Sequence, residues 1–307
     1  MLFLASFILK GQSQAALVTA TMAILGLALP PAMWLSSAAV VLVTLVYGAQ
    51  RGFITIVLSV IGAGLFAYLI FATPQIALIF VVFAWFPAWL SAMVLRQTVS
   101  LAYSLQVLTV LGLVAVVFIY GLFPDVGELW REPLDEVISQ LAQQSDDLSL
   151  QELKQTENWV IEFMPGLLVS SVMFGTMLSL LLGRWWQAVF YNPGGFAKEF
   201  QSLNLGKVSA LVALVIVLLA SYVDSILVLA LAAVVLLLYS MQALSLLHAA
   251  VNIRKIKTVW LIFIYLTIFF VPHLLLLLIL ASYVYPWLDI RKRLSQTALM
   301  AGELRKA

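Results

Sequence analysis

The chain has 307 residues, of which 64% are hydrophobic and 10% are charged, and its mean hydropathy is +1.10. A soluble core of this size cannot hide so much apolar surface, so the composition excludes an ordinary soluble globular protein and predicts that the chain lies in a lipid bilayer. The net charge of +2 gives no reason to expect nucleic acid as a partner. Because the chain has no cysteine, disulfides and thiolate metal ligands are excluded.

A series of apolar runs approaches the ~20 residues that a membrane-spanning helix needs. In chain order they cover roughly residues 14–29, 33–47, 52–71, 75–95, 101–122, 165–182, 208–223, 225–248 and 259–283. Pro30 and Pro31 separate the first two runs, and Asp224 separates the seventh from the eighth, so we expect each pair to form a tight helical hairpin. The predicted fold class is an all-α polytopic transmembrane bundle of about 8–10 spans.

Charge divides the chain along its length, because ten of the 14 acidic residues fall between Asp125 and Glu162. Such a segment belongs outside the membrane. The predicted organisation is an N-terminal bundle of about five spans (1–122), an acidic extracytoplasmic segment (123–162), a C-terminal bundle (163–288) with a cytoplasmic loop (183–207), and a basic tail (289–307).

Lysine and arginine are enriched at the cytoplasmic ends of spans. If Lys10 is cytoplasmic, strict alternation of the spans places Arg51, Arg96 and Arg184 on the same side and the acidic segment on the other. This pattern predicts a multi-pass membrane protein with a cytoplasmic N-terminus.

The C-terminal tail does not fit strict alternation. If residues 259–283 form one helix, the basic tail emerges on the outer side. Pro272 and His273 lie in the middle of this run, so it would instead split into a re-entrant hairpin that returns the tail to the cytoplasm. The second alternative is the favoured one, because translocation of such a basic end is unfavourable.

The acidic segment carries its own helical pattern. Apolar residues recur at i, i+3, i+4 and i+7, as an amphipathic helix requires, at Leu134, Val137, Ile138 and Leu141. A second helix is predicted from Ser149, with Glu152 in capping-box spacing, after a polar turn at 143–147. The two helices would lie on the outer interface or cap the bundle, and a dedicated partner-binding site is the alternative.

Motifs of catalysis are missing from the sequence. It contains no G-x-x-x-x-G-K-[ST] phosphate loop, no H-E-x-x-H and no nucleophile elbow. We therefore predict no enzyme activity, no cofactor, and no catalytic, cofactor-binding or metal-ligating residue. His273 is the candidate intramembrane polar site, because a titratable group within an apolar run is expected to face a protein interior or a water cavity.

Two stretches are candidates for docking a partner. Ala16 and Ala20 lie four residues apart, a spacing that lets two helices approach closely, and it suits packing within the bundle as well as docking. The other stretch is the predicted loop GRWWQAVFYNPGGFAKEFQSLNLGK, whose tryptophans are typical anchors at headgroup depth. Its candidate docking residues are Arg184, Trp185, Trp186, Asn192, Gly194, Gly195, Phe196 and Glu199.

This loop, with R-W-W-Q-A followed by N-P-G-G-F and E-F, resembles the signature of the YybS-like family of uncharacterised bacterial multi-pass membrane proteins. A second fragment agrees, because Trp287, Leu288, Asp289 and Arg291 resemble the closing aromatic, Asp and Arg pattern of that family. The resemblance covers essentially the whole chain and implies a polytopic helical fold.

The family is in turn distantly similar to the substrate-binding S components of energy-coupling-factor transporters. Ala16 and Ala20 match the small-residue docking motif of the first S-component helix, and Leu29-Pro30-Pro31 precedes the second span. Residues 48–53 stand where S components often have a Gly-Pro-x-x-Gly turn, with Ala49 in place of the proline. This similarity implies that a separate ATPase and coupling module supplies energy, with Ala16 and Ala20 as the docking face.

The favoured function is therefore a non-catalytic inner-membrane protein that binds a small or lipid-like molecule as an S-component-like, transport-related subunit. The alternative is a membrane scaffold or assembly factor whose acidic segment recruits envelope proteins. A third possibility is an enzyme that acts on lipid-linked substrates, for which His273 is the single intramembrane titratable group on offer.

Overall fold

The computed structural model describes residues 2–144 and 150–288, and these residues form helices and no strand. Six of the described helices are long and apolar enough to cross a membrane, or up to eight if each of two bent helix pairs counts as one span. The chain is a polytopic α-helical membrane bundle, as its composition predicts. In order, the helices are α1 (Leu2–Ile8), α2 (Gln12–Gly26), α3 (Pro30–Tyr47), α4 (Ala49–Phe71), α5 (Ile76–Phe80), η1 (Val81–Trp85), α6 (Phe86–Thr98), α7 (Leu101–Leu122), η2 (Pro124–Trp130), α8 (Arg131–Gln144), α9 (Leu150–Tyr191), α10 (Gly195–Gln201), α11 (Gly206–Tyr222), α12 (Ile226–Ile253), α13 (Val259–Phe270) and α14 (His273–Leu288).

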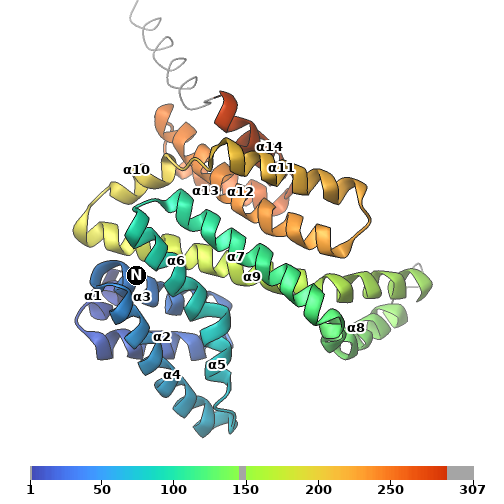
Figure 1. Ribbon diagram of the computed structural model, residues 1–307, viewed down its shortest axis with the longest axis horizontal. Coiled ribbons are helices and arrows are strands. Elements are labelled where there is room, and N and C mark those ends of the chain that lie inside the picture. Colours follow the sequence, from blue (N-terminus) through green and yellow to red (C-terminus); the bar gives the residue numbers. More distant parts are fainter. Residues whose placement is uncertain (1, 145–149, 289–307) are drawn as a thin grey trace, which may run out of the picture.

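The helices α1 to α6 form one lobe, α10 to α14 form another, and α7 and α9 run between them (Figure 1). Within the first lobe α3 is the innermost helix, since residues 36–45 are all buried, and it packs against α2, α4, α6 and α9. The two prolines start α3, where a missing N–H costs nothing. Both predicted hairpins are confirmed, because α2 packs on α3 and α11 packs on α12.

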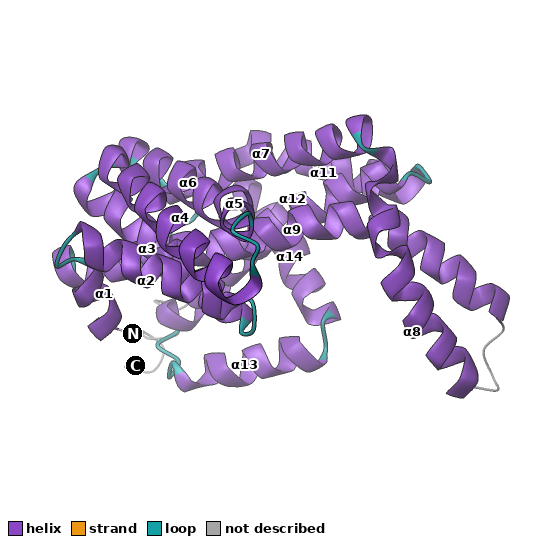
Figure 2. Ribbon diagram, turned by 90° about the horizontal axis from the view of Figure 1, so that it is seen from below, coloured by secondary structure: helices purple, strands orange, loops and turns teal. Residues whose placement is uncertain are grey.

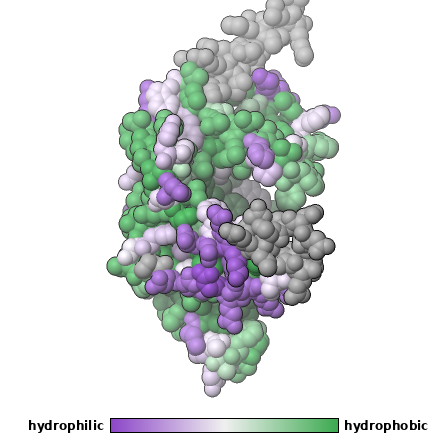
Figure 3. Space-filling model, turned by 90° about the vertical axis from the view of Figure 1, so that its right-hand side faces the viewer, coloured by the Kyte–Doolittle hydropathy of each residue, from purple (hydrophilic) through white to green (hydrophobic). Residues whose placement is uncertain are grey.

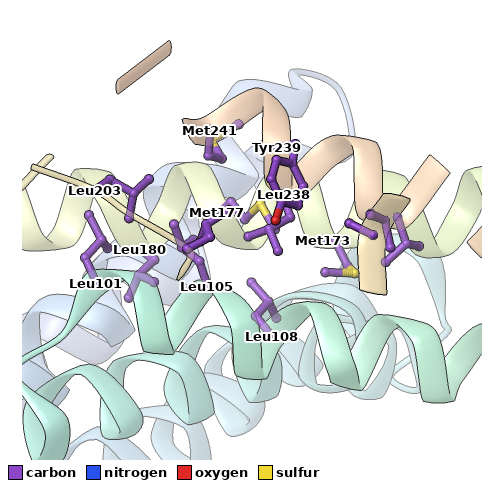
Figure 4. Close-up of a cluster of buried hydrophobic side chains, with 14 of the residues drawn as sticks. Leu101, Leu105, Leu108, Met173, Met177, Leu180, Leu203, Leu238, Tyr239 and Met241 are labelled. Carbon is purple, nitrogen blue, oxygen red and sulfur yellow. The ribbon is translucent and has the colours of Figure 1, made fainter. Parts of the chain in front are cut away.

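The core between the lobes is formed by side chains of α7, α9 and α12 (Figure 4). Leu105 from α7 and Met177 and Leu180 from α9 are completely buried there, and Tyr239 of α12 closes the cluster from the other side. Since lipid tails are as apolar as these side chains, the cluster stabilises the fold by close packing and not by leaving water.

Helix α9 contradicts the expected boundaries. The second helix of the acidic segment, the span at 165–182 and the first part of the predicted loop 183–207 form one continuous helix of 42 residues. At 1.5 Å per residue it is about 63 Å long, roughly twice the ~30 Å hydrocarbon core. It continues because Pro165 is tolerated within a membrane helix and no strong breaker occurs before Asn192-Pro193-Gly194.

The N-terminal end of α9 forms a hairpin with α8 that projects from the bundle, and hydrophilic residues gather there (Figure 1 and Figure 3). The predicted amphipathic helix is confirmed, with Leu134 and Ile138 half-buried and Val137 exposed. Arg131 donates to Glu128 and, at 3.1 Å, to Asn158 of α9, and its hydrogen bond lowers the pKa of the Glu128 carboxyl. The predicted turn at 143–147 and the cap at 149 lie largely outside the described residues.

The last apolar run is split, as the presence of Pro272 predicted. Helix α13 ends at Phe270, α14 begins at His273, and the two helices are bent by 111°. Figure 2 shows α13 running below the bundle and joined to it through α14. Proline cannot donate the N–H that a continuous helix needs here. The basic tail 289–307 lies outside the described residues.

Candidate functional site

An apolar groove of about 460 Å³ runs between α2 and α4. Ala16 and Ala20 form part of its wall, opposite Gly62 and Ala63 of α4, and a Cβ added at Gly62 would lie 3.5 Å from the Cβ of Ala20. The remaining lining residues are Ser13, Leu17, Thr21, Ile24, Leu25, Leu58 and Phe66. Because Leu17, Thr21 and Phe66 are exposed, the groove opens on the surface of the bundle.

Hydrogen bonds hold α2 on α4 beside this groove. Ser59 Oγ donates to the carbonyl of Ala16 at 3.2 Å, and Gln12 Nε2 donates to the carbonyl of Arg51 and to Thr55 Oγ1, both at 2.7 Å. Ala16 and Ala20 are only 8% and 9% exposed. The small residues therefore bring two helices of the same chain together, which is the packing role that their spacing allows.

Basic residues from three helices meet at one end of the bundle, around the end of α3. Arg96 Nη1 donates to the carbonyl of Leu45, and Gln187 Nε2 donates to the same carbonyl at 3.3 Å. Arg184 Nη1 in turn donates to Gln187 Oε1 at 3.0 Å. This end, which also carries Lys10 and Arg51, is called the basic end below.

The predicted docking residues in the 183–207 stretch have different environments. Trp186 is completely buried among α1, α2 and α3, so the prediction of a headgroup anchor at this position is wrong, and its side chain is closed to a partner. Trp185 is half-buried against the same cluster. Both tryptophans lie on α9, whose inner face packs on α3, and a loop at this point would have left them free.

The turn after α9 is where this stretch reaches the surface. Asn192 and Gly194 are exposed, and Gly194 has φ +80°, a left-handed conformation that glycine adopts without steric cost. A Cβ on Gly195 would lie 2.2 Å from Asn192 Nδ2, so that glycine lets the turn close. Phe196 is half-buried and stacks on Phe200 of α10, with ring centroids 5.9 Å apart.

Arg184 and Glu199 form the ion pair that fixes α10 against α9. The Nη2–Oε2 distance is 2.8 Å, and their side chains are 15% and 20% exposed. Replacing Arg184 with glutamine is expected to lower the free energy of unfolding by about 2 kcal/mol, because the Glu199 carboxylate loses its charged partner in a largely buried place. Unfolding of the detergent-solubilised protein measures the effect, and the charge swap R184E with E199R should recover part of it.

Two glutamines that the sequence reasoning did not single out hold the break between α10 and α11. Gln242, which is completely buried, accepts from the Leu205 N–H and donates to the carbonyl of Ser282, both at 2.7 Å. Gln106 donates to the carbonyl of Leu205 at 2.7 Å. The signal was present, since each is a lone amide in an apolar span, and such a group must find a partner inside the protein.

His273, the candidate intramembrane polar site, is exposed at the start of α14. It does not face the protein interior, because the break at Pro272 places it at an exposed helix end, and the alternative, a water cavity, stays a prediction. The second histidine, His248, contacts side chains of two other helices. His248 of α12 lies 2.6 Å from Tyr265 Oη of α13, and its ring makes an edge contact with Phe200.

No family model, curated protein or solved structure matches this chain. Its class therefore rests on its own sequence and geometry. These define a polytopic α-helical membrane protein with an apolar surface groove in its first lobe, interrupted helices in its second lobe, and an acidic helical hairpin outside the bundle.

Proposed function

We propose that the chain is a non-catalytic membrane protein that binds an apolar, lipid-like molecule in the groove between α2 and α4. The groove itself carries the proposal. Its volume of about 460 Å³ lies within the range of small-molecule sites, and Ser13 and Thr21 are the only lining residues with polar side chains. Such a lining suits an acyl or isoprenoid chain.

The resemblance to S components gives this binding a role in transport. The chain has no phosphate loop, so ATP-driven transport needs a separate ATPase with its coupling module. We place the N-terminus and the basic end on the cytoplasmic side of a bacterial inner membrane, where the positive-inside rule puts them and where such a module would be met. The exposed turn at Asn192 and Gly194 is available to it.

Filling the groove should remove the bound molecule. Replacing the exposed Thr21 with tryptophan puts a large side chain into the groove without entering the contact between α2 and α4. We expect occupancy by co-purifying amphiphiles, measured by native mass spectrometry, to fall at least about tenfold, a change that corresponds to ~1.4 kcal/mol. The double variant A16L with A20L should have the same effect and also push the two helices apart.

The matched control is Val114→Trp, which adds the same side chain at an exposed position of α7 outside the groove. Equal amphiphile occupancy in the T21W and V114W variants would contradict the proposal. If the A16L/A20L variant instead loses a co-purifying ATPase while Thr21→Trp keeps it, the small residues serve docking and not ligand binding.

The alternative function is a membrane scaffold for envelope proteins, and the projecting hairpin of α8 and α9 favours it. Its exposed acidic residues stand clear of the bundle, where a basic partner surface could reach them (Figure 3). A variant with Glu132, Asp135 and Glu136 changed to glutamine distinguishes the two. The scaffold loses its co-purifying envelope proteins in this variant, whereas a lipid-binding protein keeps its bound amphiphile.

A further inference from the structure

A second pocket lies at the basic end of the first lobe and shares no lining residue with the groove. Its volume is about 280 Å³, and it forms where α1 turns into α2 and meets the end of α3 and the start of α4. At ~30 Å³ for each water molecule this space would hold about nine waters, enough for a phosphate group and its ester carbons. Its lining residues are Ile8, Leu9, Lys10, Gly11, Gln12, Ala15, Val43, Tyr47 and Arg51.

Specific contacts hold the walls of this pocket. Tyr47 Oη donates to the carbonyl of Leu9 at 2.8 Å, which ties the turn between α1 and α2 to α3. Gln12 Nε2 donates to the carbonyl of Arg51, which ties the start of α2 to α4. Lys10 Nζ lies 5.8 Å from the ring centroid of Phe7, within reach of a cation–π interaction. The two cationic side chains thus project from a fixed framework.

Among the described residues, nothing compensates the charge of the pocket. Within residues 2–144 and 150–288, neither Lys10 nor Arg51 forms an ion pair, and both described ion pairs involve other residues. The first turn of α2 adds to the positive potential, because Gly11 offers no capping side chain to its N–H groups. Two cations that share one pocket without an acid indicate an anionic ligand.

The surroundings of the pocket suit a position at headgroup depth. Phe3 and Leu2 of α1, 81% and 46% exposed, present an apolar surface just before Lys10. This arrangement is typical of a helix end that enters the membrane interface while its cation stays among the headgroups. Ile8 and Val43 supply an apolar wall beside the charges.

We propose that this pocket binds the phosphate ester of an anionic amphiphile, with Lys10 and Arg51 as its charged ligands. Basic pockets between membrane helices are recognised sites for anionic lipid headgroups. The charge balance selects the kind of headgroup. A phosphomonoester carries between −1.5 and −2 charges and matches two cations, whereas a zwitterionic headgroup brings an ammonium that the pocket repels. The proposal stands whether or not the groove holds a ligand.

The test uses the full-length protein in nanodiscs, with dioleoyl phosphatidic acid as the probe and dioleoyl phosphatidylcholine as the background lipid. Bound lipid is counted by native mass spectrometry at physiological salt, which screens long-range attraction. We expect the K10Q/R51Q variant to bind phosphatidic acid at least tenfold more weakly than the wild type. The charge-preserving Lys10→Arg variant should bind within about twofold of it, since Arg also serves as a phosphate ligand.

The matched control is R254Q/K257Q, which removes the same charge from the exposed turn between α12 and α13. Equal loss in both double variants would show a general surface attraction and overturn the site, as would unchanged binding by K10Q/R51Q.

Competition with inorganic phosphate and with glycerol 3-phosphate identifies the source of the ester. Displacement of the lipid at millimolar concentration supports the same site with a soluble phosphate ester as its ligand, and resistance to displacement supports a membrane lipid. Thermal unfolding of K10Q/R51Q within a few degrees of the wild type excludes misfolding as the cause.

Discussion

Replacing Gly183 with alanine is expected to destabilise the protein, even though alanine is the better helix former. A Cβ at this position would lie 2.5 Å from Val41 Cγ1, 2.7 Å from Val41 Cβ and 3.0 Å from the carbonyl oxygen of Ala38. These atoms belong to the innermost helix, α3, so α9 and α3 must separate along their contact. We expect a loss of about 2 kcal/mol in the free energy of unfolding, and more for leucine.

Gly121 of α7 provides the control, because a Cβ added there meets nothing within 4 Å. Gly121→Ala should leave the stability unchanged or raise it by up to ~1 kcal/mol through helix propensity. Unfolding of both variants by SDS titration in mixed micelles measures the difference. A Gly183→Ala protein as stable as the wild type would mean that the two helices pack less closely than the structure shows.

Replacing Gln242 with leucine is the second large effect that we expect. The substitution keeps the volume but leaves the Leu205 N–H and the Ser282 carbonyl without their side-chain partner. An unpaired buried group costs ~1–3 kcal/mol, whereas side-chain hydrogen bonds within membranes average ~0.6 kcal/mol, so a total loss of about 2 kcal/mol follows. The accessibility of a cysteine introduced at the buried Leu203 should rise with it, because the break between α10 and α11 loses a support.

Gln106→Leu removes one hydrogen bond to the same residue, Leu205, and should have about half the effect of Gln242→Leu. Gln97→Leu, at an exposed position, is the neutral control. If all three variants unfold alike, the glutamines do not hold the break. If Gln242→Leu alone weakens the protein but leaves a cysteine at position 203 protected, the hydrogen bond to Ser282 of α14 is the one that matters.

Local sequence patterns predicted much of the fold. Apolar runs located the six helices that are long enough to span, although the run at 14–29 forms α2, whose 15 residues are too few to be counted among them. Pro30-Pro31 and Asp224 located two hairpins, and Pro272 predicted the break before α14. The i, i+3, i+4 and i+7 pattern located α8. Each of these features depends on residues close together in the chain, because helix length, polarity and interruption are local properties.

The candidate sites were less predictable. Ala16 and Ala20 do lie at a close helix contact and line a groove, but their spacing alone did not identify α4 as the neighbouring helix. Tryptophan is a typical interfacial anchor, but Trp186 is buried, because the face of α9 that carries it packs on α3. The pocket at Lys10 and Arg51 joins a residue of the turn between α1 and α2 to a residue of α4, and no motif marks it.

The sequence by itself determined that this protein is a helical membrane bundle with an acidic segment outside the bundle, because lipid requires long apolar helices and leaves charged segments to water. Only the tertiary structure decided which faces meet. In a bilayer nearly every face of a helix is apolar, so hydrophobicity cannot select the neighbour. Close contacts at positions such as Gly183 and buried hydrogen bonds such as those of Gln242 make that choice, and they join residues far apart in the chain.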